Sequence, residues 1–371
     1  MSLSAEQDLT LYMRPFLGSH LVRSSPTPYN DAPNHQTRER EDMAESDDIR
    51  IERIFHPYAT EQMESFAKKQ GDGQVSFVHY TSAEAALRIF ENKRIWMRNV
   101  TSMSDYSEVQ HGMALLNETL FGNDGKGLKA LTEAVDGCAV GATAEAIHFL
   151  EKSWTDIRYN TYLACISEHD KEEDQHGRLS MWRAFGTTDV RVAIVFKFPY
   201  SLIHGSVFSL VVSPVAYFAK EQVEAELYRI MDNVHRNLDL LKSVGRERVV
   251  RAIYAMLVAA VTCVKHRGFS EEREWRLIYA PGRWPSPLIK PSTEVIRGIP
   301  QTIYKIPFDA SVPDAPEGLK QLDLAQLFHH LIIGPSLYPF SMLEAFGNAL
   351  QNAGVPEPAK RIVPSGIPIR M

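Results

Sequence analysis

A polar corner, His79-Tyr80-Thr81-Ser82, is the first group of residues in the sequence whose types could carry chemistry. It follows a strand-like alternation and precedes a helical pattern, so its side chains are expected at a helix N-terminus, where backbone amides favour phosphate. At such a corner His79 could hydrogen-bond a ribose hydroxyl, and Tyr80 could stack on a planar ring. The same residues are also explained without a ligand, with Thr81 as a helix cap and His79 as a half-buried strand residue.

A second group, Glu272-Arg273-Glu274-Trp275-Arg276, has the alternation of an amphipathic strand. In a strand, Glu272, Glu274 and Arg276 project from one face, while Trp275 projects from the other face toward the core. Two carboxylates this close raise one another's pKa unless a cation intervenes, and such a pair can orient a ribose hydroxyl and stabilise an oxocarbenium ion. The alternative is a solvated strand face on which Arg276 pairs with a glutamate.

A third group is the pair Trp182 and Arg183 in the segment SMWRAFG. Tryptophan offers a stacking face and arginine a phosphate contact, so the pair suits a nucleotide. A core tryptophan beside a surface arginine explains the pair equally well.

Two further groups combine histidines with acids, but neither has a recognised metal-ligand spacing. One is Asp105, Glu108 and His111, which suits acids in the first turn of a helix. The other is the charged segment from His169 to His176, which suits a surface loop. The sequence therefore predicts no metal site, and it also lacks the P-loop, Rossmann, hydrolase-elbow and zincin motifs.

Alternating strands and helices must position these groups. Strands are expected at 75–80, 94–100, 162–167, 190–198 and 269–280, with helices after Thr81 and at 221–241, 249–264 and 337–352. The pattern predicts one α+β domain over residues 49–371 with a long helical insertion at about 221–264. Residues 1–48, rich in Pro, Ser, Asn and charge, are expected to form a flexible tail.

The totals exclude some classes of function. The chain has 371 residues, 44% hydrophobic and 23% charged, which is a globular composition. Its 40 basic and 46 acidic residues give a net charge of −6, which does not favour bulk binding to nucleic acid or anionic membranes. Three scattered cysteines suit a reducing compartment, and no secretory signal or membrane span is visible, so a cytoplasmic protein without a membrane partner is expected.

Seven short segments, in order, resemble a widespread bacterial family labelled a domain of unknown function. They are VHYTS, RIWMRNVTSMSDYSE, LACISEHD, MWRAFG, FSEEREWRL, HLIIGPS and SGIPIR, and they span roughly residues 75–370. This resemblance implies a family but no activity.

The HYTS corner, with a helix and a strand after it, also resembles the opening of many ADP-ribosyltransferases, and the ExE of EREWR resembles their catalytic strand. The resemblance implies a mixed-sheet ADP-ribosyltransferase fold with NAD as substrate, Glu274 as catalytic glutamate and Glu272 beside the acceptor. Both segments would flank one cleft, with the NAD diphosphate near the helix N-terminus. The cofactor-binding residues would be His79, Tyr80, Thr81, Ser82, Trp182 and Arg183.

The leading hypothesis is therefore an NAD-dependent ADP-ribosyltransferase-like protein, a bacterial toxin, effector or defence enzyme whose acceptor is a protein or a nucleic acid. The second is a non-catalytic sensor module that binds a nucleotide, a peptide or a partner, with the helical insertion as partner surface. The third is a metal-dependent hydrolase or nuclease that uses the His and acidic groups.

Overall fold

The computed structural model describes residues 46–103, 106–184, 190–198, 206–296, 298–311, 319 and 322–368. The predicted tail, residues 1–48, lies almost entirely outside these ranges. The first described helix, α2, spans Asp47–Phe55. Within the described ranges, no helix is long and apolar enough to cross a membrane.

Ten strands of the described chain form one mixed sheet, which agrees with the predicted α+β class. The order along it is β12-β11-β4-β1-β3-β2-β10-β9, with β8 paired to β3 and β5 paired to β8. All pairs are antiparallel except β11 with β12. The strands are β1 Val75–Ser82, β2 Arg94–Asn99, β3 Tyr162–Asp170, β4 Arg191–Phe196, β5 Val211–Pro214, β8 Glu274–Tyr279, β9 Lys290–Ile296, β10 Ile299–Pro307, β11 Phe328–Ile333 and β12 Ile362–Pro364.

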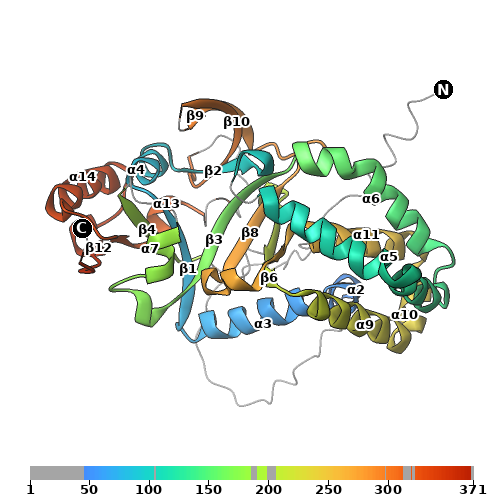
Figure 1. The fold of residues 1–371 in the computed structure, drawn as a ribbon. Helices are drawn as coiled ribbons and strands as arrows, with labels where there is room; N and C mark the ends of the chain where they lie inside the picture. Colours follow the sequence, from blue (N-terminus) through green and yellow to red (C-terminus); the bar gives the residue numbers. More distant parts are fainter. Residues whose placement is uncertain are drawn as a thin grey trace, which may run out of the picture.

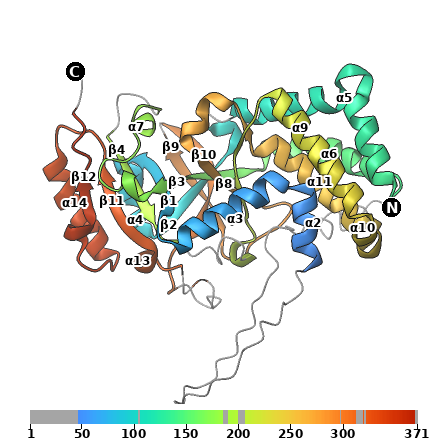
Figure 2. The ribbon, with the colours of Figure 1, turned by 90° about the horizontal axis from the view of Figure 1, so that it is seen from below.

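The helices gather in two places around the sheet (Figures 1 and 2). At one end lie α2, α5 Tyr106–Asp136, α6 Ala142–Tyr159, α9 Lys220–Arg236, α10 Leu238–Val244 and α11 Arg246–Thr262, which we call the helical layer. At the other end lie α4 Ala83–Asn92, α7 Leu179–Ala184, α13 Leu324–Leu327 and α14 Pro339–Asn352. Helix α3, Pro57–Gly71, runs along the sheet between them.

The predicted insertion at 221–264 is thus part of a larger helical layer. Its helices share one apolar core with α2, α5 and α6, to which Val234, Leu241, Ile253 and Leu257 contribute fully buried side chains. A short parallel pair, β6 Ala216–Tyr217 and β7 Val264–Lys265, leads the chain into and out of the insertion. The apolar spacing after Glu221 correctly predicted the helix α9.

The cap of α4 lies one residue later than the sequence pattern predicts. Thr81 remains in β1, and the Ser82 hydroxyl accepts a hydrogen bond from the Ala85 backbone N–H at 3.1 Å. Glu84, three residues after Thr81, pairs with Arg88 one helical turn later at 2.7 Å. The cap is displaced because β1 continues through both Thr81 and Ser82.

Substitution of Ser82 by alanine is expected to lower the free energy of unfolding by about 1 kcal/mol, the usual contribution of a serine N-cap. Thr81→Val is the matched control: it removes the neighbouring hydroxyl and keeps the shape of the side chain, so its effect should be smaller. Urea denaturation of both variants measures the difference. A larger loss for Thr81→Val than for Ser82→Ala would assign the cap to Thr81.

Burial of His56, between α2 and α3, lowers its pKa from 6.5 to about 4. The unfolded chain then binds more protons than the folded chain between these values, so this contribution to stability is complete above pH 6.5 and is lost as the pH falls toward 4. We expect the stability advantage of the wild type over His56→Gln to shrink by about 1–2 kcal/mol between pH 7 and pH 5. The comparison must be between variants, because burial raises the pKa of Glu52 to about 8 and Glu52 titrates with the opposite sign. An unchanged difference between pH 7 and pH 5 would contradict the prediction.

Candidate functional site

The sheet register places His79 and Glu274 on opposite faces of the sheet. Directly opposed residues of antiparallel strands point to the same side. Val78 opposes Ser167, and Ser167 opposes Glu274, so these three share a face. His79 follows Val78 along β1 and therefore points to the other face, where it opposes Ile194. The structure does not bring His79 and Glu274 to one cleft.

His79 is held by the backbone. Its Nδ1 lies 2.9 Å from the carbonyl oxygen of Cys165, and burial lowers its pKa. A neutral, half-buried imidazole that contacts a backbone carbonyl matches the alternative to ligand binding, in which His79 is an ordinary strand residue.

Glu274 lies in a buried ion network that joins the helical layer to the sheet. Its Oε1 accepts from Arg276 Nε at 2.8 Å and its Oε2 from Lys265 Nζ at 3.1 Å, so both oxygens are engaged. Lys265 also contacts Glu108 at 2.8 Å and Glu272 at 2.6 Å, and Arg276 also pairs with Glu108. Burial alone would raise the pKa of Glu274, but the two cations hold it at about 2. These contacts fit a structural role.

The alternation predicted Glu272 and Glu274 on one strand, but Glu272 lies outside the strand that carries Glu274. It ends a 3-10 helix, Arg267–Glu272, and Arg273 then adopts left-handed backbone geometry with φ 43° before β8 begins. The prediction that Trp275 packs into the core is confirmed, since it is 1% exposed and lies against Phe66 and Phe77. Because of the turn at Arg273, the side chains before Glu274 do not alternate between the two faces as they would in a strand.

The rings of Trp182 and Tyr80 pack against each other and do not leave a ring face free to stack on a nucleotide base. Their rings meet edge to face with centroids 4.9 Å apart, and Trp182 Nε1 donates to the His176 carbonyl at 2.8 Å. The Tyr80 hydroxyl accepts from the backbone N–H of Arg178 at 2.8 Å. Arg183 is exposed, so the pair Trp182 and Arg183 matches the alternative of a core tryptophan beside a surface arginine.

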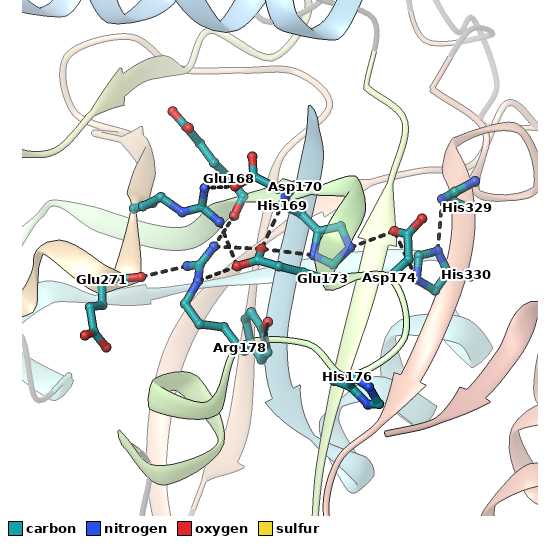
Figure 3. Close-up of polar contacts among 12 residues, drawn as sticks. Glu168, His169, Asp170, Glu173, Asp174, His176, Arg178, Glu271, His329 and His330 are labelled. Atoms are coloured by element: carbon teal, nitrogen blue, oxygen red, sulfur yellow. Dashed lines mark hydrogen bonds and ion pairs between the residues drawn. The ribbon is translucent and has the colours of Figure 1, made fainter. Parts of the chain in front are cut away.

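On the face that carries Ser167, the structure brings together His169, Asp174 and His330 (Figure 3). His169 Nε2 lies 2.9 Å from Asp174 Oδ1, and His330 Nε2 lies 3.7 Å from the same oxygen. One ligand atom from each residue lies within 4.8 Å of the others. We call these three residues the His-Asp-His group.

Strand geometry and one short loop create this group. His169 lies at the end of β3, where it opposes Ser76, and His330 lies in β11 beside a register shift between Phe328 and His330. The strands β1 and β4 lie between them, yet the two imidazole centroids are 5.8 Å apart. The loop after β3 turns through a 3-10 helix, Lys171–Glu173, and returns Asp174 to the gap between the rings.

Both imidazoles of the group are neutral near neutral pH. Burial lowers the pKa of His169, and it lowers that of His330 to about 4. The His169 side chain is fully buried and that of His330 is 9% exposed, whereas Asp174 is 38% exposed and forms the open side. Neutral nitrogen lone pairs next to a carboxylate make a donor set for a metal ion.

A shell of neighbours orients the group. His330 Nδ1 lies 2.9 Å from His329 Nδ1, and Glu173 Oε2 lies 3.7 Å from His169 Nδ1. Glu173 is itself held by Arg178 at 2.9 Å and by Arg273 at 2.8 Å. Such outer partners fix the ring orientation of histidine ligands in metal sites.

Arg178 fastens the loop to the rest of the molecule. Its guanidinium donates to the carbonyl oxygens of Glu168, Glu271 and Glu272 at 2.7–3.0 Å. His176, in the same loop, turns away from the group and contacts the Ser365 carbonyl oxygen through Nδ1 at 2.6 Å. The loop lies at the surface, as its composition predicts, with Lys171, Glu172, Gln175 and His176 exposed, but Arg178 and His176 fasten it to the rest of the molecule.

Two glycines allow the Trp182 ring to pack beside this loop. A Cβ on Gly334 would lie 2.9 Å from both the Arg191 carbonyl oxygen and a Trp182 ring carbon, and one on Gly177 would lie 2.5 Å from that ring. We expect Gly334→Ala to lower the free energy of unfolding by about 1–3 kcal/mol, as overpacking does. Gly347→Ala, in α14 with open space around it, should instead stabilise by up to about 1 kcal/mol. Urea denaturation tests the pair, and equal effects would contradict the packing argument.

The sequence offered a weak signal for this site. His169, Asp174 and His176 lie close together in the sequence and include possible metal ligands. His330 lies in a different segment of the chain, so no local pattern connects it with them. Five of the segments that carry the family resemblance meet around the group: LACISEHD, MWRAFG, FSEEREWRL, HLIIGPS and SGIPIR, through His169, Trp182, Arg273, His330 and Ser365. In the other group that combines a histidine with acids, Glu108 pairs with Lys265 and Arg276, and Asp105 lies outside the described residues.

Comparison with known proteins gives one match. Residues 181–277 match the family described as "Protein of unknown function (DUF2971)". The matched segment runs from α7 through the helical insertion to β8. No curated protein and no solved structure matches the chain. The predicted resemblance to a family of unknown function is confirmed.

Proposed function

Residues 181–277 match a family of proteins of unknown function, which leaves the activity open, and we propose that the protein is a metal-dependent hydrolase. Its ion would be a divalent transition metal held by His169 Nε2, His330 Nε2 and a carboxylate oxygen of Asp174.

The observation that carries the proposal is the position of His330 Nε2. This nitrogen is buried, makes no hydrogen bond of ordinary geometry among the described residues, and faces Asp174, whose Oδ1 lies 3.7 Å away. A buried polar atom without a partner is costly to the fold, so native structures rarely keep one without a role. An ion between the two rings and the carboxylate would satisfy all three groups together.

The distances suit a small ion. Ligand atoms of a tetrahedral zinc ion, with bonds of about 2.0–2.2 Å, lie roughly 3.3 Å from one another. The separations of 2.9 Å and 3.7 Å from Asp174 bracket that value, and the two imidazole nitrogens lie within 4.8 Å of each other, so side-chain movements would complete the site. Two imidazoles favour zinc and similar ions, whereas calcium and magnesium prefer all-oxygen ligands.

The partial exposure of Asp174 supports a catalytic rather than a structural site. Structural zinc sites have four protein ligands, but catalytic sites have three and keep a position for water, whose pKa the ion lowers to about 7. In hydrolysis, the oxygen of a water molecule would form a bond to the electrophilic atom of the substrate, the bond from that atom to the leaving group would break, and the leaving group would take up a proton released by the water. His169, Asp174 and His330 would hold the ion, and Glu173 and His329 would orient the two histidines.

The NAD-dependent transferase stays a prediction that the observed contacts do not favour. Glu274 has both oxygens in ion pairs, and His79 lies on the other face of the sheet. A calorimetric titration with NAD, together with a nicotinamide-release assay on Glu274→Gln, tests it directly.

Calorimetric titration of chelator-treated protein with Zn²⁺ tests the proposed function. We expect one equivalent to bind to the wild type and no detectable binding of Mg²⁺ or Ca²⁺. Asp174→Asn should weaken zinc binding and remove any zinc-dependent hydrolysis of activated ester and phosphodiester substrates. Absence of zinc binding would overturn the site, while binding without hydrolysis would keep the site and refute the hydrolase.

A further inference from the structure

A cavity lies where the helical layer meets the sheet, away from the His-Asp-His group. It has a volume of about 110 Å³, and its walls come from α2, α3, α5, α9, α11 and the strands β5 to β7. Leu116, Ile230, Met256 and Leu257 are among the apolar side chains that line it. The cavity is partly open to solvent and its lining is mostly apolar, so a ligand that fills it would remove apolar surface from water.

One polar side chain in the wall lacks a partner. Thr119 of α5 is 7% exposed, and its hydroxyl has no hydrogen-bond partner within the part of the chain that the structure describes. A hydroxyl both donates and accepts, so it can bind an alcohol or a carbonyl group of a ligand. The unpaired hydroxyl therefore points to a ligand that carries one such group.

The other polar groups of the wall exclude a charged ligand. Glu226 accepts a hydrogen bond from the backbone N–H of Tyr58 at 2.8 Å and lies 3.5 Å from Arg229, so its carboxylate is already engaged. His56 is neutral, since burial lowers its pKa to about 4. A charged group placed among the remaining apolar side chains would lose its hydration without gaining a counter-charge.

The size of the cavity limits the ligand further. An apolar protein cavity of about 150 Å³ holds one benzene molecule, so a slightly smaller space accepts a body of roughly six carbons. A peptide or a nucleotide is too large for it. Most of the lining residues fall between Ser213 and Val264, inside the segment that matches the family.

We propose that this cavity binds a small neutral molecule with an apolar body of about six carbons and one hydroxyl or carbonyl group. The ligand contacts α5, α9 and α11 together with β5 to β7, so its binding ties the helical layer to the sheet. The inference is independent of the metal site.

The probe is 1-hexanol, titrated into the wild-type protein and followed by NMR chemical shifts and by the melting temperature. We expect saturable binding and a higher melting temperature with 1-hexanol, and at least about tenfold weaker binding of hexanoate because its carboxylate must be buried. Ala259→Leu, which adds a side chain to the wall, should abolish binding. Thr119→Val should weaken 1-hexanol binding severalfold and leave that of benzene unchanged.

Far-UV circular dichroism and urea denaturation of each variant serve as the folding control, because neither depends on the proposed metal site. Absence of saturable 1-hexanol binding to the wild type would overturn the proposal, as would equal binding to Ala259→Leu. Equal loss of 1-hexanol and benzene binding in Thr119→Val would refute the role of the hydroxyl.

Discussion

Replacing Arg276 with methionine is expected to lower the free energy of unfolding by about 3–5 kcal/mol. The side chain is fully buried, and its guanidinium pairs with Glu274 and Glu108 and donates to the Thr262 carbonyl. Without it, three carboxylates would share one cation, Lys265, in a site with little water. A buried carboxylate without a partner costs more than the lost contact alone.

Glu274→Gln is the matched variant for this prediction. It removes one carboxylate and leaves two anions, Glu108 and Glu272, against the two cations, so the loss should be smaller, about 1–2 kcal/mol. Urea denaturation at pH 7 measures both variants. If Arg276→Met is as stable as the wild type, the network does not contribute to folding. If Glu274→Gln loses NAD turnover with unchanged stability, Glu274 is catalytic after all.

Replacing His330 with alanine is expected to weaken zinc binding by at least about 100-fold, because loss of even an outer partner of a metal ligand costs 10–100-fold. His330 supplies one of only three protein ligands in the proposed site. The expected stabilisation of the wild type, about 2.7 kcal/mol at a zinc concentration 100 times Kd, should disappear in the variant. Calorimetry and thermal unfolding with and without zinc measure both quantities.

His176→Gln is the control for His330→Ala. His176 belongs to the loop that carries Asp174, but it turns away from the group and contacts Ser365. Its replacement should leave zinc affinity within a factor of about three, since it contacts neither the ion nor a ligand. Equal losses in the two variants would mean that the loop, rather than three specific ligands, governs binding. His329→Ala should lie between them, because His329 only orients His330.

Local patterns in the sequence were enough to predict most of the elements. The alternation of Val75 to Tyr80 predicted β1, and the apolar spacing after Glu221 predicted α9. Trp275 was correctly placed in the core, and the resemblance to a family of unknown function was correct. These features depend on residues within one turn or one strand of each other, so short-range periodicity carries them.

Backbone detail at element ends was less predictable. Thr81 and Ser82 are both good caps, and the position at which β1 stops decides which of them acts. Glu272 was assigned to a strand because it alternates with Glu274, but the left-handed turn at Arg273 interrupts the strand between them. Both errors arise where two elements compete for the same few residues.

Which side chains share a site was decided by the tertiary structure alone. The sequence of β1 and that of β8 each show which residues share a face of that strand. Both strands pair with β3, and this pairing decides which face of β1 lies on the same side of the sheet as which face of β8. It places His79 and Glu274 on opposite sides. Likewise, His330 reaches His169 only because β11 and β3 belong to one sheet and a loop returns Asp174 between them. The sequence determined the faces of each strand, whereas register and strand order, which depend on contacts between distant segments, decided which faces meet.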